Sequence, residues 1–540
     1  MSLRIRDDIV HLESTIGSNM AQTVAGGTLT IPSSMPAADR IVKMSATAHV
    51  KEHWLEEDRV NIEGMLSVNL IYAGQYDTGQ TYYGGVQSAE VVAFSHFVDI
   101  PGAMPGMTPH STATVLDLQP TLRSDGRTVD VDSVLEVSST VLRAQELAFL
   151  TDASVSPPRK IKVSKDTFHF DDVVGQGPAQ TEIRHVLPVS LGSERPLRIL
   201  ELVGSFKVAE KRAAVDRGVL SGTMSYKAVC VVLSEHTDDE QLRVYSWDDV
   251  ARMELSAEIP SARPGMTIHA EVAPPTVFGR VINEGQSIGV EGVQSAIIKV
   301  VEQGDIPVVT GLEADSNLKI GLRTESIMYE KVGDGATKDV HIDGSVDLPD
   351  SRPPLEKLLD VEVRAAVAST SLVGGRVTVT GYLDLAAMYV ARTDDFTQPV
   401  YHAVWNNAGT FETSINMPTV SADGKLEADV IVLNVQGEPL SRETIGFQGT
   451  LKVICRARER VAKEVVAEAV ELRQFPGRLP TYTCVTLQAE DTLWQLATKY
   501  GVTTEVLLEQ NPALADLDDY DVLPAGSKII ISKQGASSLV

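Results

Sequence analysis

Cysteine is scarce in this chain of 540 residues, which has only Cys230, Cys455 and Cys484. They are far apart and odd in number, so they form neither a disulfide framework nor a zinc motif, and we interpret them as small apolar residues in strands. Long apolar runs are also missing, because no stretch approaches the roughly 18–20 residues that cross a bilayer. The sequence therefore predicts no metal site and no membrane insertion.

Positive charge is in deficit: 47 lysines and arginines face 73 acidic residues, which gives a formal net charge of −26. A surface of this kind repels phosphate backbones and anionic lipid headgroups, so nucleic acid is excluded as a partner. The chain starts MSLRIRDDIVHLES, with Asp7 and Asp8 where a signal peptide needs an apolar run. We therefore expect a cytoplasmic protein.

Catalytic signatures are absent as well. The sequence has no HExxH, no Walker A and no GxSxG motif, and its 11 histidines do not cluster with cysteines or carboxylates. The stretch VGDGATK (332–338) resembles a phosphate loop, but we interpret it as one copy of a repeated glycine turn. The stretch HTDDE (236–240) could hold a hard cation, but a solvated hairpin tip is the preferred interpretation. The sequence predicts a protein that is not an enzyme, with no catalytic residues, no cofactor and no metal.

What is present is a long internal repeat. The segment DRVNIEGMLSVNLIY (58–72) returns in altered form at 216–230 and 375–389, and its glycine recurs as Gly64, Gly222 and Gly381. These glycines are 158 and 159 residues apart.

Other landmarks keep the same spacing: Gly17, Gly175 and Gly333 follow each other at 158 residues, and IPGAMPGM (100–107) returns as IPSARPGM (259–266). The chain therefore reads as three tandem repeats, at 1–160, 161–318 and 319–475.

Each repeat has the pattern of an antiparallel β domain. After Gly64, apolar residues stand at every second position, which indicates a strand with one buried face, and Gly, Pro and Asp interrupt the short alternating runs. The fold class is mainly β, with three sandwich-like or barrel-like repeats, and each copy is either one sandwich or two smaller sheets. The segment 457–472 favours helix by propensity. Its counterparts in the other copies do not, so we predict mostly strand there.

The end of the chain changes pattern. After a linker at 476–480, residues 481–533 predict two short helices between two strands, and 534–540 a disordered tail. Asp491 is placed to cap the first helix, Gly501 to end it and Thr503 to cap the second.

The segment 481–533 resembles the LysM family, whose pattern includes a GDTLWxIAxxYGV stretch, and the match here is AEDTLWQLATKYGV. The resemblance implies a βααβ module with a ligand groove between the loop that enters the first helix and the loop that leaves the second. The residues that this assigns to the groove are Asp491, Thr492, Leu493, Asn511, Pro512, Leu523 and Pro524. Trp494 is expected in the core. The module has eight acidic residues against three lysines, which favours a protein partner over an anionic wall polymer.

The three repeats resemble the SPOCS domain, formerly the domain of unknown function 3794. The resemblance rests on VGQGPAQ, DRVNIEGMLSVNLIY, VDIPGAMPGM and the Leu-Pro pairs at 187–188 and 348–349. SPOCS domains followed by one LysM module resemble the SipL family of spore-envelope proteins. That resemblance implies a structural adaptor in the mother-cell cytoplasm, whose LysM module docks on the coat-basement scaffold ATPase or another spore-envelope protein.

Two other functions remain open at this point. A LysM module that holds peptidoglycan, a polymer containing N-acetylglucosamine, would make the chain a wall-binding protein. LysM modules also occur in phage-like particles, so a tail or baseplate component is the third hypothesis.

Overall fold

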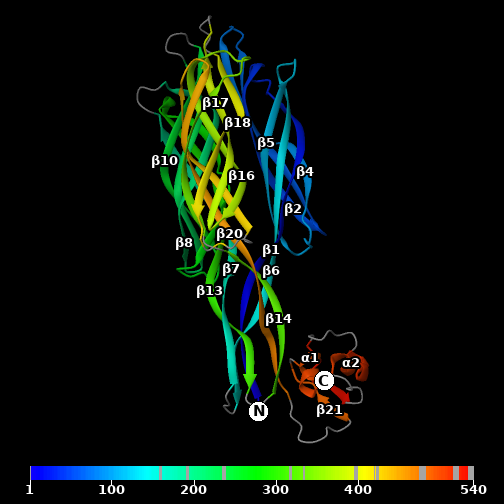
Figure 1. Ribbon diagram of the computed structural model, residues 1–540. Coiled ribbons are helices and arrows are strands. Elements are labelled where there is room, and N and C mark those ends of the chain that lie inside the picture. Colours follow the sequence, from blue (N-terminus) through cyan, green and yellow to red (C-terminus); the bar gives the residue numbers. More distant parts are fainter. Residues whose placement is uncertain are drawn as a thin grey trace.

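The chain folds into a long β-rich body and a small helical module (Figure 1). The computed structural model describes residues 2–156, 161–189, 194–233, 239–314, 319–332, 335–393, 399–418, 420, 425–472, 482–489, 491–514 and 522–532. Within these residues, no helix has both the length and the apolar character needed to span a membrane.

The first repeat is a sandwich of two antiparallel sheets. Its strands are β1 (Ser2–Thr30), β2 (Ala38–Glu56), β3 (Arg59–Gln75), β4 (Thr81–Asp99), β5 (Thr108–Leu122) and β6 (Thr128–Ser156). One sheet has the order β2-β3-β4 and the other β1-β6-β5. Leu66 and Leu70 from β3 share one buried core with Leu135 and Val137 from β6. This answers the question left open by the sequence, because both sheets of the first repeat belong to one sandwich.

The later repeats follow the same plan, with one strand divided in each: the counterpart of β5 in the second repeat and the counterpart of β1 in the third. The elements of the second are β7 (Ile161–Pro188), β8 (Pro196–Ala214), β9 (Arg217–Leu233), β10 (Glu240–Glu258), β11 (Thr267–Val272), β12 (Thr276–Ile282), η1 (Asn283–Gly285) and β13 (Ser287–Ala314). Those of the third are β14 (Lys319–Val332), β15 (Ala336–Asp347), β16 (Leu355–Val373), β17 (Arg376–Ala391), β18 (Val400–Asn416), β19 (Lys425–Pro439) and β20 (Thr444–Leu472). Strands β9 and β17 are central in their three-stranded sheets, as β3 is.

The mainly β fold class is therefore confirmed, and so is the strand predicted at 457–472, which is part of β20 and pairs with β14. The proposed repeat boundaries at 160, 318 and 475, the linker 476–480 and the tail 534–540 fall on residues outside the described ones. They stay predictions.

A stalk continues from the sandwiches. Strands β1 and β6 have 29 residues each and pair along nearly their whole length, as β7 and β13 do in the second repeat. Figure 1 shows one half of each long pair in the body and the other half in a narrow stalk, where β14 and β20 join them. Phe149, Val308 and Val465, one from each pair, are buried together in the stalk.

The glycine predicted to form a turn in each repeat has a different role. Gly17 lies inside β1 at a β-bulge, and Gly175 lies at the matching bulge of β7. A Cβ on Gly17 would come within 2.7 Å of Cγ2 of Ile100. The turn interpretation was wrong because the glycine admits a close neighbour where the strand bends, rather than reversing the chain. Gly333, the third member, is outside the described residues.

A second shared core joins the three repeats in the body. Ile71, Val229 and Met388 hold equivalent positions on β3, β9 and β17, and all three are buried in one cluster. The central strands are therefore apolar on both faces at this end, one face toward their own sandwich and the other toward the neighbouring repeats.

Charged side chains lie beside this shared core. Lys43, Glu201 and Asp360 are equivalent residues, because they are the register partners of Ile71, Val229 and Met388. The Nζ atom of Lys43 is 2.8 Å from Oε2 of Glu201, and both side chains are more than nine-tenths buried. Lys227 forms a second ion pair with Asp360 at 2.9 Å. We call these residues, with Glu362, the axial charge cluster.

The electrostatics of the axial charge cluster follow from burial and opposite charges. Burial alone would lower the pKa of Lys43, but Glu201 and Glu362 outweigh it and raise the pKa above its usual value. Burial would likewise raise the pKa of Glu362, yet the ammonium groups of Lys43 and Lys227 lower it to about 2. Burial dominates at Asp360 and raises its pKa although Lys227 opposes the shift.

His402 on β18 makes the body sensitive to mild acid. Burial, followed by the charge of Lys43, lowers the pKa of His402 to about 4. Between pH 6.5 and 4 the imidazole of His402 is protonated in the unfolded chain but neutral in the folded chain. The free energy of unfolding is therefore unaffected by this residue above pH 6.5. As the pH falls below 6.5, it decreases by up to about 1.4 kcal/mol per pH unit for this one site.

The corresponding measurement is the free energy of unfolding at pH 7, 6 and 5. We expect His402→Gln to flatten the decline between pH 7 and 5, whereas His341→Gln, at an exposed histidine of β15, leaves it unchanged. Equal slopes for the wild-type chain and the His402 variant would contradict the assignment.

Candidate functional site

The helical module at the end of the chain contains the predicted groove. Its elements are β21 (Tyr482–Thr486), α1 (Leu493–Tyr500), α2 (Thr504–Gln510), η2 (Pro512–Leu514) and β22 (Lys528–Ser532). Strands β21 and β22 pair antiparallel, and the two helices lie between them in the sequence. The predicted βααβ order is confirmed.

The buried face of α1 sets the orientation of the entry loop. Leu493, Leu496, Ala497 and Tyr500 are buried, at the spacing of one helix face, and Gly501 ends the helix in the left-handed conformation with φ of 66°. The second helix begins as predicted, because Oγ1 of Thr503 accepts a hydrogen bond from the backbone N of Val506.

The predicted cap of α1 was wrong by one residue. Thr492 has the extended conformation of an N-cap, and its Oγ1 accepts a hydrogen bond from the backbone N of Gln495 at 3.2 Å. The carboxylate of Asp491 instead accepts a hydrogen bond from the backbone N of Gln488 at 2.7 Å. Asp491 therefore shapes the loop before the helix, while Thr492 satisfies the helix end.

The structure buries three of the seven residues assigned to the groove. The side chains of Leu493 and Leu523 are in the core of the module, and Thr492 is only 6% exposed. These residues offer a ligand mainly backbone groups. Pro512 and Pro524 are exposed and Asp491 is half-buried, so their side chains remain accessible. Trp494, expected in the core, is half-buried.

Hydrogen bonds join the entry loop to the segment before β22. The backbone N of Leu523 donates to the carbonyl of Asp491 at 2.8 Å, and Thr492 forms an antiparallel bridge with Val522. The structure thus brings the groove residues of 491–493 together with those of 523–524.

Asn511 does not take part in this contact between the entry loop and the segment before β22; it links α2 to β22 instead. Its Nδ2 donates to the carbonyls of Leu507 and Ile530, and its Oδ1 accepts from the backbone N of Ile530, each at 2.8 Å. The amide therefore fastens the end of α2 to β22, and Pro512 follows it at the start of η2. The predicted ligand role of these groove residues stays a prediction.

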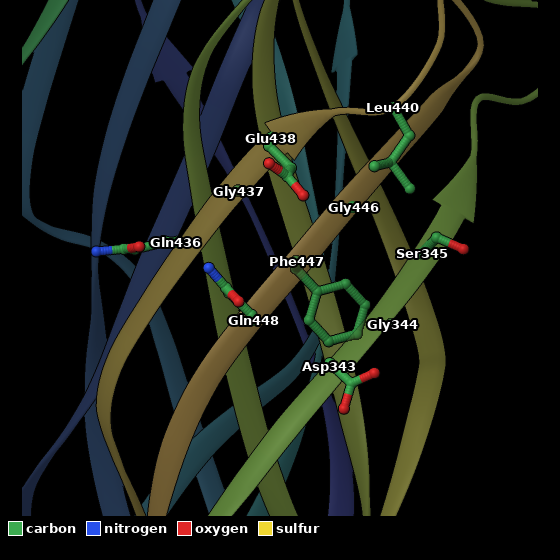
Figure 2. Close-up of a pocket in the computed structure, with 10 residues that line it drawn as sticks. All are labelled: Asp343, Gly344, Ser345, Gln436, Gly437, Glu438, Leu440, Gly446, Phe447 and Gln448. Carbon is green, nitrogen blue, oxygen red and sulfur yellow. The ribbon is translucent and has the colours of Figure 1, made fainter.

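A cavity of about 410 Å³ in the third repeat was not predicted from the sequence. Residues 343–345 of β15, 436–438 of β19, Leu440 and residues 446–448 of β20 line it (Figure 2). No motif marks these residues in the sequence, because the register of three strands brings them together.

The profiles of two known families match segments of the chain. The profile of the SipL, SPOCS domain family matches residues 37–122 and 354–438, which span β2 to β5 and the equivalent β16 to β19. The LysM domain profile matches residues 485–532. No curated protein and no solved structure matches the chain. Two segments of the chain therefore match the SPOCS domain of the SipL family, and a third segment, 485–532, matches the LysM domain.

Proposed function

We propose that this chain is a non-enzymatic assembly protein of the spore envelope, whose LysM domain docks the SPOCS repeats on a coat-basement scaffold ATPase. The observation that carries the proposal is the combination of two SPOCS matches with one LysM match in a single chain. In this role the chain works on the mother-cell side of the forespore. SPOCS and LysM domains bind other molecules and do not catalyse reactions.

The acidity of the LysM domain supports a protein partner. Eight acidic side chains stand against three lysines in 481–533, and such a surface is repelled by an anionic wall polymer. The accessible groove residues include Asp491 and two prolines, with no basic side chain among the seven. A scaffold protein that presents basic or apolar groups fits this groove.

Such an adaptor does not need one large interface with its partner to bind tightly. Several weak contacts on one chain raise the effective concentration of each next contact, so affinity accumulates without one strong site. The SPOCS repeats, which share cores in the body and in the stalk, would present their outer surfaces as one rigid unit.

The test is capture of the scaffold ATPase from sporulating cells by the full chain and its variants. Pro524→Glu adds a charge to the groove, and because proline has no backbone N–H, the replacement removes no donor from the domain. Tyr482→Ala, on an exposed residue of β21, is the matched control. We expect capture to fall at least tenfold in Pro524→Glu and in a chain without 481–540, and to persist in the control. Full capture by the shortened chain would refute the docking role.

Binding to peptidoglycan is the second candidate, because the LysM match favours it. Sedimentation of the full chain with purified peptidoglycan at low salt separates the two. We expect the chain to stay in the supernatant. Pelleting that Pro524→Glu abolishes would establish the wall-binding role instead.

A further inference from the structure

Strand β21 of the LysM domain has an open backbone edge. Cys484 on β21 and Ile530 on β22 are register partners. The backbone N of Ile530 donates to Oδ1 of Asn511, and its carbonyl accepts from Nδ2 of the same side chain. Both groups of Ile530 therefore point away from β21, so Cys484 and Ile530 form a non-hydrogen-bonded pair of the antiparallel ladder. The backbone N–H and carbonyl of Cys484 then point away from β22.

The alternation of the ladder extends this edge along the strand. Tyr482 and Thr486, two residues before and after Cys484, have the same orientation in the ladder, so their backbone groups also point outward. The carbonyl of Thr486 accepts a hydrogen bond from Nε2 of Gln488 at 3.2 Å. The two edges of this sheet thus differ, because Asn511 caps β22 whereas β21 presents a row of backbone groups.

Strand β21 also lacks the features that protect sheet edges elsewhere in the chain. Charged residues, prolines and β-bulges on an edge strand prevent it from pairing with another chain. In the part of the chain that the structure describes, every other edge strand contains at least one charged residue. Strands β2, β8 and β16 also have three register shifts each. The sequence of β21 is YTCVT, without charge, proline or bulge, so its edge is free to accept a further strand.

The exposed face of the same small sheet is uncharged apart from one lysine. Its described residues are Tyr482, Cys484, Thr486, Lys528 and Ile530, and all of them are exposed. Tyr482 and Ile530 are 64% and 48% exposed. Two chains that each have a net charge of −26 repel one another over most of their surfaces, but this face brings no acidic side chains together.

We propose that β21 pairs with β21 of a second copy of this chain, antiparallel and centred on Cys484. A two-fold axis at Cys484 joins the outward groups of this residue in the two copies, and it places Tyr482 of each copy opposite the partner's Thr486. The strand is therefore its own complement, and the contact closes at two copies. Two sheets of two strands become one sheet of four, which overcomes the marginal stability of a two-stranded sheet.

A paired LysM domain would present two grooves and two sets of β repeats in one particle. Contacts that are weak in one copy then gain effective concentration from the other. The pairing uses the edge of β21, whereas the predicted groove lies at 491–493 and 523–524. The inference therefore does not rest on the proposed docking role, and the two can fail separately.

Sedimentation equilibrium of the full chain under reducing conditions tests the pairing. We expect a reversible dimer with a dissociation constant on the order of 100 μM, because the contact is small. Cys484→Pro removes a backbone N–H that points away from β22, so the ladder inside the domain is retained. This variant should stay monomeric, while Cys484→Ser, the matched control, should dimerise as the wild-type chain does. Circular dichroism and thermal unfolding verify that both variants fold.

Three outcomes would overturn the proposal. The first is a wild-type chain that stays monomeric well above 100 μM, and the second is a folded Cys484→Pro variant that dimerises normally. In the third, the wild-type chain is monomeric but Cys484→Pro loses capture of another protein, so the edge accepts a strand of that protein instead.

Oxidative cross-linking of the wild-type chain tests the register without a disruptive variant. The two Cys484 residues would form a hydrogen-bonded pair with Cα atoms about 5.5 Å apart, within the range of a disulfide. Copper(II)-phenanthroline accepts the two electrons released when two thiols lose their protons and form the S–S bond. Cys230 and Cys455 are buried, so a linked dimer reports on Cys484.

The control for the register moves the thiol by two residues. In Cys484→Ser with Thr486→Cys, each new cysteine lies opposite the partner's Tyr482, and the two thiols are separated by about four residues of strand, or roughly 13 Å. We expect at least tenfold less cross-linked dimer than in the wild-type chain. Equal cross-linking of the two chains would show random collision and refute the pairing centred on Cys484.

Discussion

Replacing Lys43 by methionine is expected to cost about 3–5 kcal/mol of folding free energy. The ammonium of Lys43 is 2.8 Å from a carboxylate of Glu201, and the two side chains are 9% and 8% exposed. Without Lys43, Glu201 stays buried with Ser45, which donates to its other oxygen at 2.9 Å, but it loses the ammonium that neutralises its charge. An unpaired buried carboxylate is far more costly than an absent ion pair.

Two further variants separate this effect from the loss of an ordinary ion pair. In Lys43→Met with Glu201→Met, both charges are gone and most of the stability should return. Arg59→Met breaks the Arg59–Asp99 pair, whose side chains are 41% and 62% exposed, and should cost at most about 1 kcal/mol. Urea denaturation followed by tryptophan fluorescence measures all three. A loss below 1 kcal/mol in Lys43→Met would show that water or another cation replaces the ammonium.

Replacing Gly381 by alanine is the second large effect, expected at about 1–3 kcal/mol. A Cβ on Gly381 would be 2.3 Å from the carbonyl oxygen of Ala366 and 2.3 Å from Cε1 of Phe411. The first of these atoms is backbone, at a bulge between Val367 and Ser369 of β16. Neither neighbour can yield without disturbing the sheet or the core, so the strand pair must separate locally.

Gly304 provides the matched control for Gly381→Ala. It also lies in a long strand, β13, and no atom is within 4 Å of a Cβ added there. Gly304→Ala should change stability by no more than about 0.5 kcal/mol. If the two alanine variants have the same thermal unfolding midpoint, the contacts around Gly381 do not constrain the fold.

The sequence predicts the class of the fold because both of its signals are visible without knowledge of the tertiary structure. Alternation after Gly64 specifies a strand with one buried face, and repetition specifies how often the unit occurs. The second buried face was also visible, as continuous apolar runs where β3, β9 and β17 end. Interpreting such a run as a contact between repeats requires knowing which strands meet, and that depends on tertiary packing.

In the LysM domain too, the elements could be predicted from the sequence, but the roles of individual residues depend on tertiary packing. Its elements follow from capping residues and apolar spacing, but Asp491 and Thr492 are both good N-caps, so local chemistry cannot choose between them. The structural role of Asn511 depends on Ile530, 19 residues away. The cavity of the third repeat could not be predicted either, because its lining comes from three strands that only the register of the sheet brings together.

The axial charge cluster could not form in a trimer of three identical subunits. Three identical subunits around an axis would place the same residue at all three equivalent positions, so a lysine there would face two other lysines. In this protein those positions hold Lys43, Glu201 and Asp360. Covalent linkage of the repeats permits each copy to diverge, and opposite charges can then neutralise one another at a junction where rotational symmetry would enforce repulsion.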